Sequence, residues 1–184
     1  MGLRYQESCR PSGKSPGISI IMLPRNARPP SMSANGTQQL IAAQDSARQD
    51  PNLQPNTPTP GTTHCNQATF DIARAVGAPV GPLSDGHGGP ALADTIVDNL
   101  KSSDLYKPVS SQAAQSLANQ GNLVIAAQPN PVGHGHVATV KPGPDNQGSD
   151  PMMNNIGRTV GIMPASHAFN PHLQPPFYYT PTTP

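Results

Sequence analysis

The chain has 184 residues, of which 34% are hydrophobic and 4% aromatic, and its formal net charge is +1. Proline occurs 24 times, and a chain this rich in proline and poor in apolar residues is not expected to fold along its whole length. The eleven basic residues form no stripe interleaved with aromatic residues, which argues against a nucleic-acid partner. Nor does any apolar run approach the roughly 18 residues that a membrane span needs. We therefore expect a folded core of about 120 residues.

The N-terminal third of the chain is dominated by prolines. We expect residues 1–60 to form a disordered arm and a proline-rich linker, with a short helix possible at 37–49. The apolar run at residues 18–23 is stopped by Pro24 and is shorter than the core of a secretory signal, so we expect no signal peptide. The domain itself is predicted over residues 61–180.

The pattern changes at residue 62, where a helix is predicted that ends just before Gly77. Thr62 or Thr63 can cap its start, and Gly77 suits the position just after its end. Apolar residues at helical spacing give it one inward face, namely Ala68, Ile72, Ala75 and Val76. Cys65 precedes Ala68 by three residues and Ile72 by seven, which places its side chain on that buried face, in the first turn.

Two more helices and a run of strands are predicted downstream. The helices span 90–101, with Leu92 inside, and 111–119, between a Ser110 cap and a Gly121 stop. The strands are predicted at residues 123–127, 136–140, 152–163 and 177–179, with a hairpin connection at 129–135. Helices followed by strands indicate an α+β fold, with the helices packed on one face of a small antiparallel sheet.

Cys65 and His136 are the residues best placed for chemistry. A helix start favours the thiolate form of a cysteine, which is the nucleophilic form. His136 opens an apolar strand, so the sheet holds its ring rigidly enough to act as a base. A third polar group usually orients such an imidazole. Asn154 and Asn155 are both available, and strand alternation puts only one of them on the useful face.

Two stretches resemble the NlpC and CHAP peptidoglycan hydrolases, which are papain-like enzymes. The first is Cys65-Asn66-Gln67-Ala68 at a helix start, and the second is Gly135-His136-Val137-Ala138-Thr139-Val140. The resemblance covers roughly residues 60–165. It implies a papain-like fold and cleavage of a peptide or amide bond in cell-wall stem peptides. By this resemblance Cys65 is the nucleophile, His136 the base and Asn155 the orienting residue, and no cofactor is needed.

Other residues of the same region have weaker roles. His64, Asn66 and His134 are candidates for substrate binding. His134, His136 and Cys65 are also possible zinc ligands, but no metal-binding spacing supports them and no metal site is predicted. Cys65 alone reads equally well as a small buried core residue. Cys9 lies in the proline-rich arm and is expected to pair with nothing.

The expected partners follow from the resemblance. Bacterial stem peptides lie outside the cytoplasm, so the protein would be made in the cytoplasm and reach the cell wall without a signal peptide, as a delivered antibacterial effector or a lysis enzyme. A secretion machine or an immunity protein is then a possible partner. The alternatives are a non-catalytic binding or structural protein on the same fold, and a papain-like enzyme acting on proteins.

Overall fold

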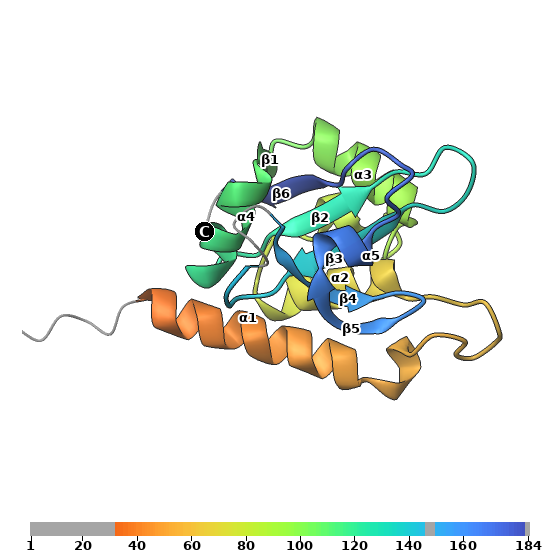
Figure 1. The fold of residues 1–184 in the computed structure, drawn as a ribbon, viewed down its shortest axis with the longest axis horizontal. Helices are drawn as coiled ribbons and strands as arrows, with labels where there is room; N and C mark the ends of the chain where they lie inside the picture. Colours follow the sequence, from red (N-terminus) through yellow and green to blue (C-terminus); the bar gives the residue numbers. More distant parts are fainter. Residues whose placement is uncertain (1–31, 146–149, 183–184) are drawn as a thin grey trace, which may run out of the picture.

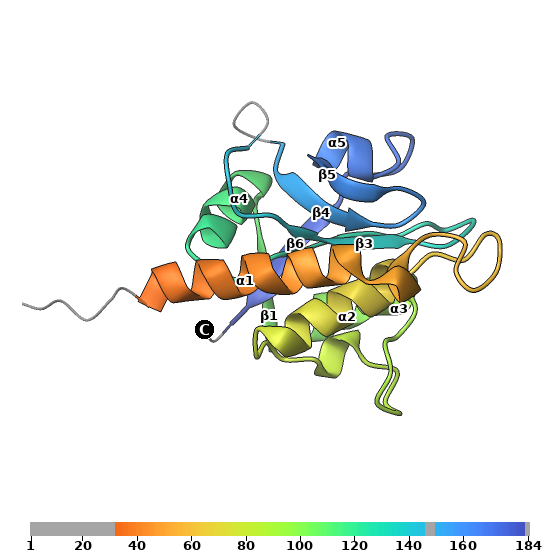
Figure 2. The ribbon, with the colours of Figure 1, turned by 90° about the horizontal axis from the view of Figure 1, so that it is seen from below.

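A computed structural model of the chain describes residues 32–145 and 150–182. Their centre is a six-stranded sheet in the order β1-β6-β2-β3-β4-β5, in which every pair of neighbours is antiparallel. Helices cover both faces of this sheet, which gives the three layers seen edge-on in Figure 2. The α+β class with an antiparallel sheet is thereby confirmed.

The order of elements along the chain is followed most easily in Figure 1. The strands are β1 (Tyr106–Val109), β2 (Ile125–Gln128), β3 (His136–Val140), β4 (Met152–Ile156), β5 (Val160–Pro164) and β6 (Phe177–Pro181). The helices are α1 (Met32–Gln49), α2 (Cys65–Ala75), α3 (Ala93–Ser102), α4 (Ser111–Asn119) and α5 (Ala165–Ala168). Within the described ranges, no helix combines the length and the apolar character needed to cross a membrane.

The helices do not all lie on one face, so that part of the prediction is wrong. Helices α1, α2 and α3 lie on one side of the sheet, and α4 and α5 lie on the other (Figure 2). Strand alternation divides the core in the same way: Val137 packs with the first group, and Ala138 with the second. Because β2 and β3 are apolar on both faces, each face needs its own cover.

Helix α1 belongs to the same core, although we expected residues 1–60 to be arm and linker. Leu40 on α1 is fully buried, and Leu53, in the short 3-10 turn Pro51–Leu53, is 5% exposed. Thr37 donates a hydrogen bond to the Asn119 carbonyl at the end of α4. The core therefore begins well before residue 61, and residues 1–31 lie outside the described ranges.

The capping residues in the sequence predict the starts of the other helices to within a few residues. Helix α4 has the predicted Ser110 cap, whose side chain accepts a hydrogen bond from Ala113 N. Helix α2 begins at Cys65, but its N-cap is His64 rather than Thr62 or Thr63. Leu92 is the extended residue before α3 and is 67% exposed, so its predicted inward position is wrong.

The strands differ from prediction at the C-terminal side. The predicted strand over residues 152–163 is a hairpin of β4 and β5, closed by a hydrogen bond from Gly157 N to Thr159 O. Strand β1 was not predicted, and it pairs with β6 at one edge of the sheet. Strand β3 spans the predicted residues and forms a hairpin with β2, in which His136 lies opposite Gln128.

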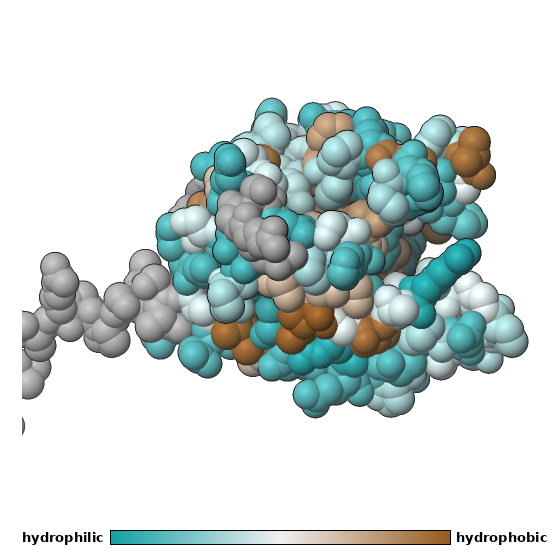
Figure 3. All heavy atoms as spheres, viewed as in Figure 1, coloured by the Kyte–Doolittle hydropathy of each residue, from teal (hydrophilic) through white to brown (hydrophobic). Residues whose placement is uncertain are grey.

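The face of the molecule seen in Figure 1 is mainly hydrophilic, with apolar side chains in small separate groups (Figure 3). Among the described residues, the exposed large apolar side chains are Leu92, Leu105 and Val132 in loops, Ile162 on β5 and Phe177 on β6.

Candidate active site

The start of α2 and the start of β3 bring Cys65 and His136 together. Cys65 is the first residue of α2 and is 7% exposed, on the buried face that its spacing predicts. The His136 ring and the backbone N–H groups of Val137 and Asn66 lie near enough to its thiol to lower the thiol pKa. The sulfur therefore lies among donors at a helix N-terminus, a setting that stabilises a thiolate.

Asn155 holds the other side of the imidazole. Its Oδ1 atom lies 2.7 Å from His136 Nε2, while its Nδ2 donates to Thr159 O, also at 2.7 Å. Because the Thr159 carbonyl fixes the orientation of the amide, Oδ1 faces the ring and Nε2 must carry the proton. That tautomer leaves Nδ1 as the nitrogen that can accept the thiol proton.

Asn154 points the other way. Both asparagines are 2% exposed, but Asn154 Oδ1 accepts a hydrogen bond of 2.9 Å from Arg48 of α1. Successive strand residues face opposite sides of a sheet, so β4 offers one amide to the histidine and the other to the helix. Of the two candidates for the third position, only Asn155 contacts His136.

The pKa values of the two central groups shift toward each other. Burial raises the pKa of the Cys65 thiol, but the hydrogen bond and the charge interaction with His136 outweigh it, and the net pKa lies below the ordinary value. Burial likewise lowers the pKa of His136, yet its interactions with Cys65 and Asn155 raise the net pKa above the ordinary value. Both shifts favour a thiolate–imidazolium pair.

Two residues that the sequence analysis did not single out shape the space around His136. The Phe169 ring packs against the imidazole, with 5.2 Å between ring centroids and planes tilted by 58°. Gly157 follows β4 and lies against the ring, so that a Cβ atom there would come within 2.9 Å of His136 Cε1. A glycine in the hairpin turn was a visible signal, whereas nothing near Phe169 in sequence links it to residue 136.

Asp94 and Gln128 brace the segments on either side of the histidine. The Asp94 carboxylate, in the first turn of α3, accepts hydrogen bonds from Asn130 N at 3.0 Å and Gly135 N at 2.9 Å. Gln128 donates to the carbonyls of Asn170 and Gln174 and accepts from Asn170 N. The hairpin that leads into His136 and the loop after Phe169 are thereby fixed to the core.

A cavity of about 580 Å³ opens over Cys65, His136 and Asn155. His134, a candidate for substrate binding, lines this cavity. Its lining also includes Arg158, Thr159 and His167, which the sequence analysis did not propose for substrate binding. His64 and Asn66 do not line it. The His64 ring bonds the Thr57 carbonyl, and Asn66 Nδ2 donates to the Ala91 carbonyl.

Within the described ranges, no three or more side chains of His, Cys, Asp or Glu are grouped so that they could hold an ion. Cys65 is a free, buried thiol, and Cys9 lies outside the described residues. Cys65, His136 and Asn155 together provide a thiol, an imidazole and an orienting amide, which are the groups that nucleophilic catalysis by a cysteine uses.

Comparison with known proteins adds no assignment. A scan against models of protein families finds no match, and a search of curated proteins finds no relative.

Proposed function

We propose that this protein is a cysteine hydrolase of the papain-like, NlpC/CHAP type that cleaves a peptide or amide bond in bacterial stem peptides. The observation that carries the proposal is the chain of contacts from the Cys65 thiol to the His136 ring and on to Asn155. A nucleophile, a base and a group that orients the base are the three parts that covalent acyl transfer requires. A buried core cysteine would need none of these partners.

The reaction begins with the thiolate. Cys65 attacks the carbonyl carbon, and the resulting oxyanion is stabilised by the Cys65 backbone amide at the α2 N-terminus. His136, protonated on both nitrogens, gives the Nδ1 proton to the leaving nitrogen as the C–N bond breaks, which leaves a thioester. His136 then removes a proton from water, the hydroxide oxygen bonds to the acyl carbon, and the thiol is released. No redox partner or metal enters this balance.

The cavity chemistry is compatible with a stem peptide. Arg158 is the one lining residue with a formal positive charge among the described residues, and no acidic residue lines the cavity. Stem peptides carry free carboxylates next to their amide bonds, and a guanidinium is well suited to bind them. The resemblance at residues 65–68 and 135–140 favours the same substrate class.

A cell-wall substrate also sets the location and the partners. The protein is proposed to be made in the cytoplasm and delivered to the periplasm or cell wall as an antibacterial effector or a lysis enzyme. A secretion machine is then its partner during delivery, and an immunity protein is a second candidate.

The experiment compares wild type with Cys65→Ala on purified sacculi, with the soluble fragments identified by mass spectrometry. We expect wild type to release stem-peptide fragments with one new carboxyl and one new amine end, and Cys65→Ala to release none. Cys9→Ser serves as the matched control, because it removes a thiol from outside the described residues. Intact sacculi with wild type, or equal release by Cys65→Ala, would contradict the proposal and favour a protein substrate or a non-catalytic role.

A further inference from the structure

Asp94 closes the end of the β2–β3 hairpin, where His136 begins β3. It lies in the first turn of α3, and its Oδ1 and Oδ2 atoms accept hydrogen bonds of 3.0 Å from Asn130 N and 2.9 Å from Gly135 N. Bonds to an ionised acceptor are roughly twice as strong as bonds between neutral groups. The hairpin loop is therefore tied at both of its ends to a single carboxylate of α3.

The strand ladder holds the backbone of His136 mainly from one side. His136 and Gln128 form the last register pair of the β2–β3 hairpin. On the other side of β3, the strand β4 pairs with it further along, at Thr139 and Val140. The end of a ladder is where strands fray first. The bond from Gly135 N to Asp94 therefore limits the motion of the backbone at the residue just before the histidine.

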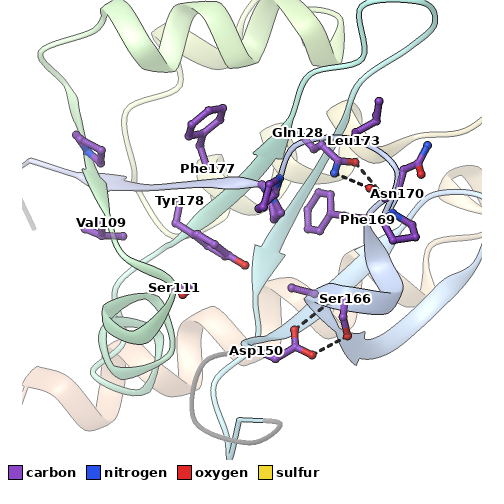
Figure 4. A pocket seen from close by; sticks show the side chains of 15 residues that line it. Val109, Ser111, Gln128, Asp150, Ser166, Phe169, Asn170, Leu173, Phe177 and Tyr178 are labelled. Carbon is purple, nitrogen blue, oxygen red and sulfur yellow. Dashed lines mark hydrogen bonds between the residues drawn. The ribbon is translucent and has the colours of Figure 1, made fainter.

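The aromatic contact on the His136 ring leaves room for movement. Phe169 lines the cavity over Cys65 and also a second cavity of about 630 Å³, which Figure 4 shows from close by. The loop that follows Phe169 is held by Gln128, which is hydrogen-bonded to Asn170 (Figure 4). A side chain with open space beside it lacks the close packing of a core residue. Phe169 therefore does not fix the position of the imidazole by itself.

Gly135 makes the short approach of Asp94 possible. It is buried, and a Cβ atom there would collide with Asp94 Oδ1 and come within 2.8 Å of Gln128 O. Its φ angle is not in the left-handed region, so the glycine serves this close approach and not a special backbone conformation. Helix α3 is a firm anchor for the carboxylate, because Ile96 and Val97 are fully buried in the core.

We propose that Asp94 is a positioning residue, which keeps the His136 imidazole beside Cys65 by holding the end of the hairpin to α3. Asp94 bonds the backbone next to the histidine, so its effect on the ring is one of geometry. A displacement of about 1 Å is enough to cost a catalytic contact about 100-fold in rate. This inference rests on the proposed function in naming His136 as the base, but the state of the Cys65 thiol is measured without any substrate.

The pH dependence of Cys65 alkylation tests this role. The rate with iodoacetamide is measured in the full-length Cys9→Ser protein, so that Cys65 is the thiol observed. Asn in place of Asp94 keeps the size, but its NH₂ group faces one of the two backbone donors, and that bond is lost. An imidazole that moves away from the sulfur no longer stabilises the thiolate. We therefore expect Asp94→Asn to shift the alkylation profile to higher pH, with a rate at pH 6 about three- to tenfold below wild type.

Two further variants separate position from charge. Asp98→Asn is the matched control, because it removes the same charge one turn further along α3, where the side chain is 78% exposed. It should leave the alkylation profile unchanged. Gly135→Ala keeps the Asp94 carboxylate and blocks its approach, so it should shift the profile as Asp94→Asn does. A shift in Asp94→Asn without one in Gly135→Ala would mean that charge acts and not position, and it would overturn the proposal.

A purely structural role has a different signature. Asp94→Asn would then lower the urea midpoint of unfolding while the folded protein keeps the wild-type alkylation profile, and this result would contradict the proposal. If neither variant folds, amide hydrogen exchange of wild type decides. The Gly135 N–H should exchange at least about tenfold more slowly than that of the exposed loop residue His134, and equal rates would show that Asp94 does not hold the hairpin.

Failure of this inference can be told apart from failure of the proposed function. If wild type cleaves sacculi but Asp94→Asn leaves the alkylation profile unchanged, the hydrolase proposal stands and the positioning role is wrong. If Asp94→Asn and Gly135→Ala both shift the profile while sacculi stay intact with wild type, Asp94 positions His136 in a site that serves another substrate.

Discussion

Gly157 lies against the imidazole of His136, so closely that a Cβ atom on residue 157 would come within 2.9 Å of His136 Cε1. The register of β3 and β4 pairs Thr139 with Asn154, and its continuation places Gly157 opposite His136. The missing side chain at 157 leaves the space in which the ring reaches Asn155, two residues earlier. The glycine is required here by steric space at the site, because its φ angle is not in the left-handed region.

Gly157→Ala is therefore expected to damage the site more than the fold. The added methyl group must push the His136 ring away from Asn155, and we expect the hydrolysis rate to fall about 100-fold, as misplacement of a catalytic group by about 1 Å does elsewhere. Release of fragments from sacculi measures the loss. Gly161→Ala is the matched control on the same hairpin, because a Cβ there meets Met163 Cε at an ordinary 3.6 Å. Equal rates for the two variants would contradict the steric argument.

The two adjacent asparagines should give opposite phenotypes. Asn155→Ala leaves the His136 Nε2 proton without its acceptor, and we expect activity to fall by 10- to 100-fold, roughly as for other groups that orient a functional histidine. Asn154→Ala removes the acceptor of Arg48 instead and should keep activity while lowering the free energy of unfolding by about 1–3 kcal/mol. Hydrolysis rates and urea denaturation of both variants test these two expectations. A larger kinetic loss in Asn154→Ala would reverse the assignment of the third residue.

The pH dependence of alkylation should differ from that of hydrolysis. The pKa of Cys65 is lowered and that of His136 is raised, and both shifts favour an ion pair, so we predict that the thiol has the lower pKa of the two. As the pH falls through the lower pKa the thiolate is protonated, and both alkylation by iodoacetamide and hydrolysis decline. As the pH rises through the upper pKa the imidazolium is lost, so hydrolysis declines while alkylation stays fast.

His136→Ala provides the control for this profile. Without the imidazole, burial is left as the largest influence on the thiol, its pKa rises, and we expect alkylation at pH 7 to slow by about tenfold or more. All measurements use a Cys9→Ser background, so that Cys65 is the thiol observed. An alkylation profile that His136→Ala leaves unchanged would mean that no ion pair forms.

How much of this site could be predicted follows from how local each signal is. Cys65 was placed on the buried face of a helix by its spacing to Ala68 and Ile72, and the His136 strand by its own apolar run. The choice of Asn155 over Asn154 depends on which of the two side chains lies on the same side of the sheet as His136. The register between β3 and β4 decides this, and it cannot be read from the β4 sequence alone. Asp94 and Phe169 reach the site from 42 residues before and 33 after His136, so no local pattern marks them.

Helix α1 was underestimated for a related reason. Its apolar stripe is thin in sequence because much of its inward face is polar. Gln44 is fully buried and donates hydrogen bonds to Thr139 Oγ1 and Val140 O, and Arg48 reaches Asn154. In sequence, a helix face of buried polar residues has the same pattern as a solvent-exposed face, and only the hydrogen-bond partners in the fold tell the two apart.

Helix α1 is accordingly expected to be part of the cooperative unit. Leu40 is fully buried in the main core cluster, and Leu40→Ala should lower the free energy of unfolding by about 2–5 kcal/mol. Chemical denaturation measures this, with the exposed neighbour Gln38→Ala as the control that should change little. A Leu40→Ala protein as stable as the control would show that α1 docks on a domain that folds without it.

Arg158 is expected to select for negative charge near Cys65. Its exposed side chain lines the cavity over the thiol, so it should speed the approach of an anion more than that of a neutral reagent. The ratio of alkylation rates with iodoacetate and iodoacetamide reports this without any substrate, and Arg158→Gln should lower the ratio about two- to fivefold. Because an exposed charge is screened by salt, the difference between the two proteins should shrink as ionic strength rises. Arg158→Lys should keep most of the ratio, since it preserves the charge. If Arg158→Gln changes both reagents equally, the guanidinium acts on the geometry of the site and the carboxylate of the substrate must be bound elsewhere.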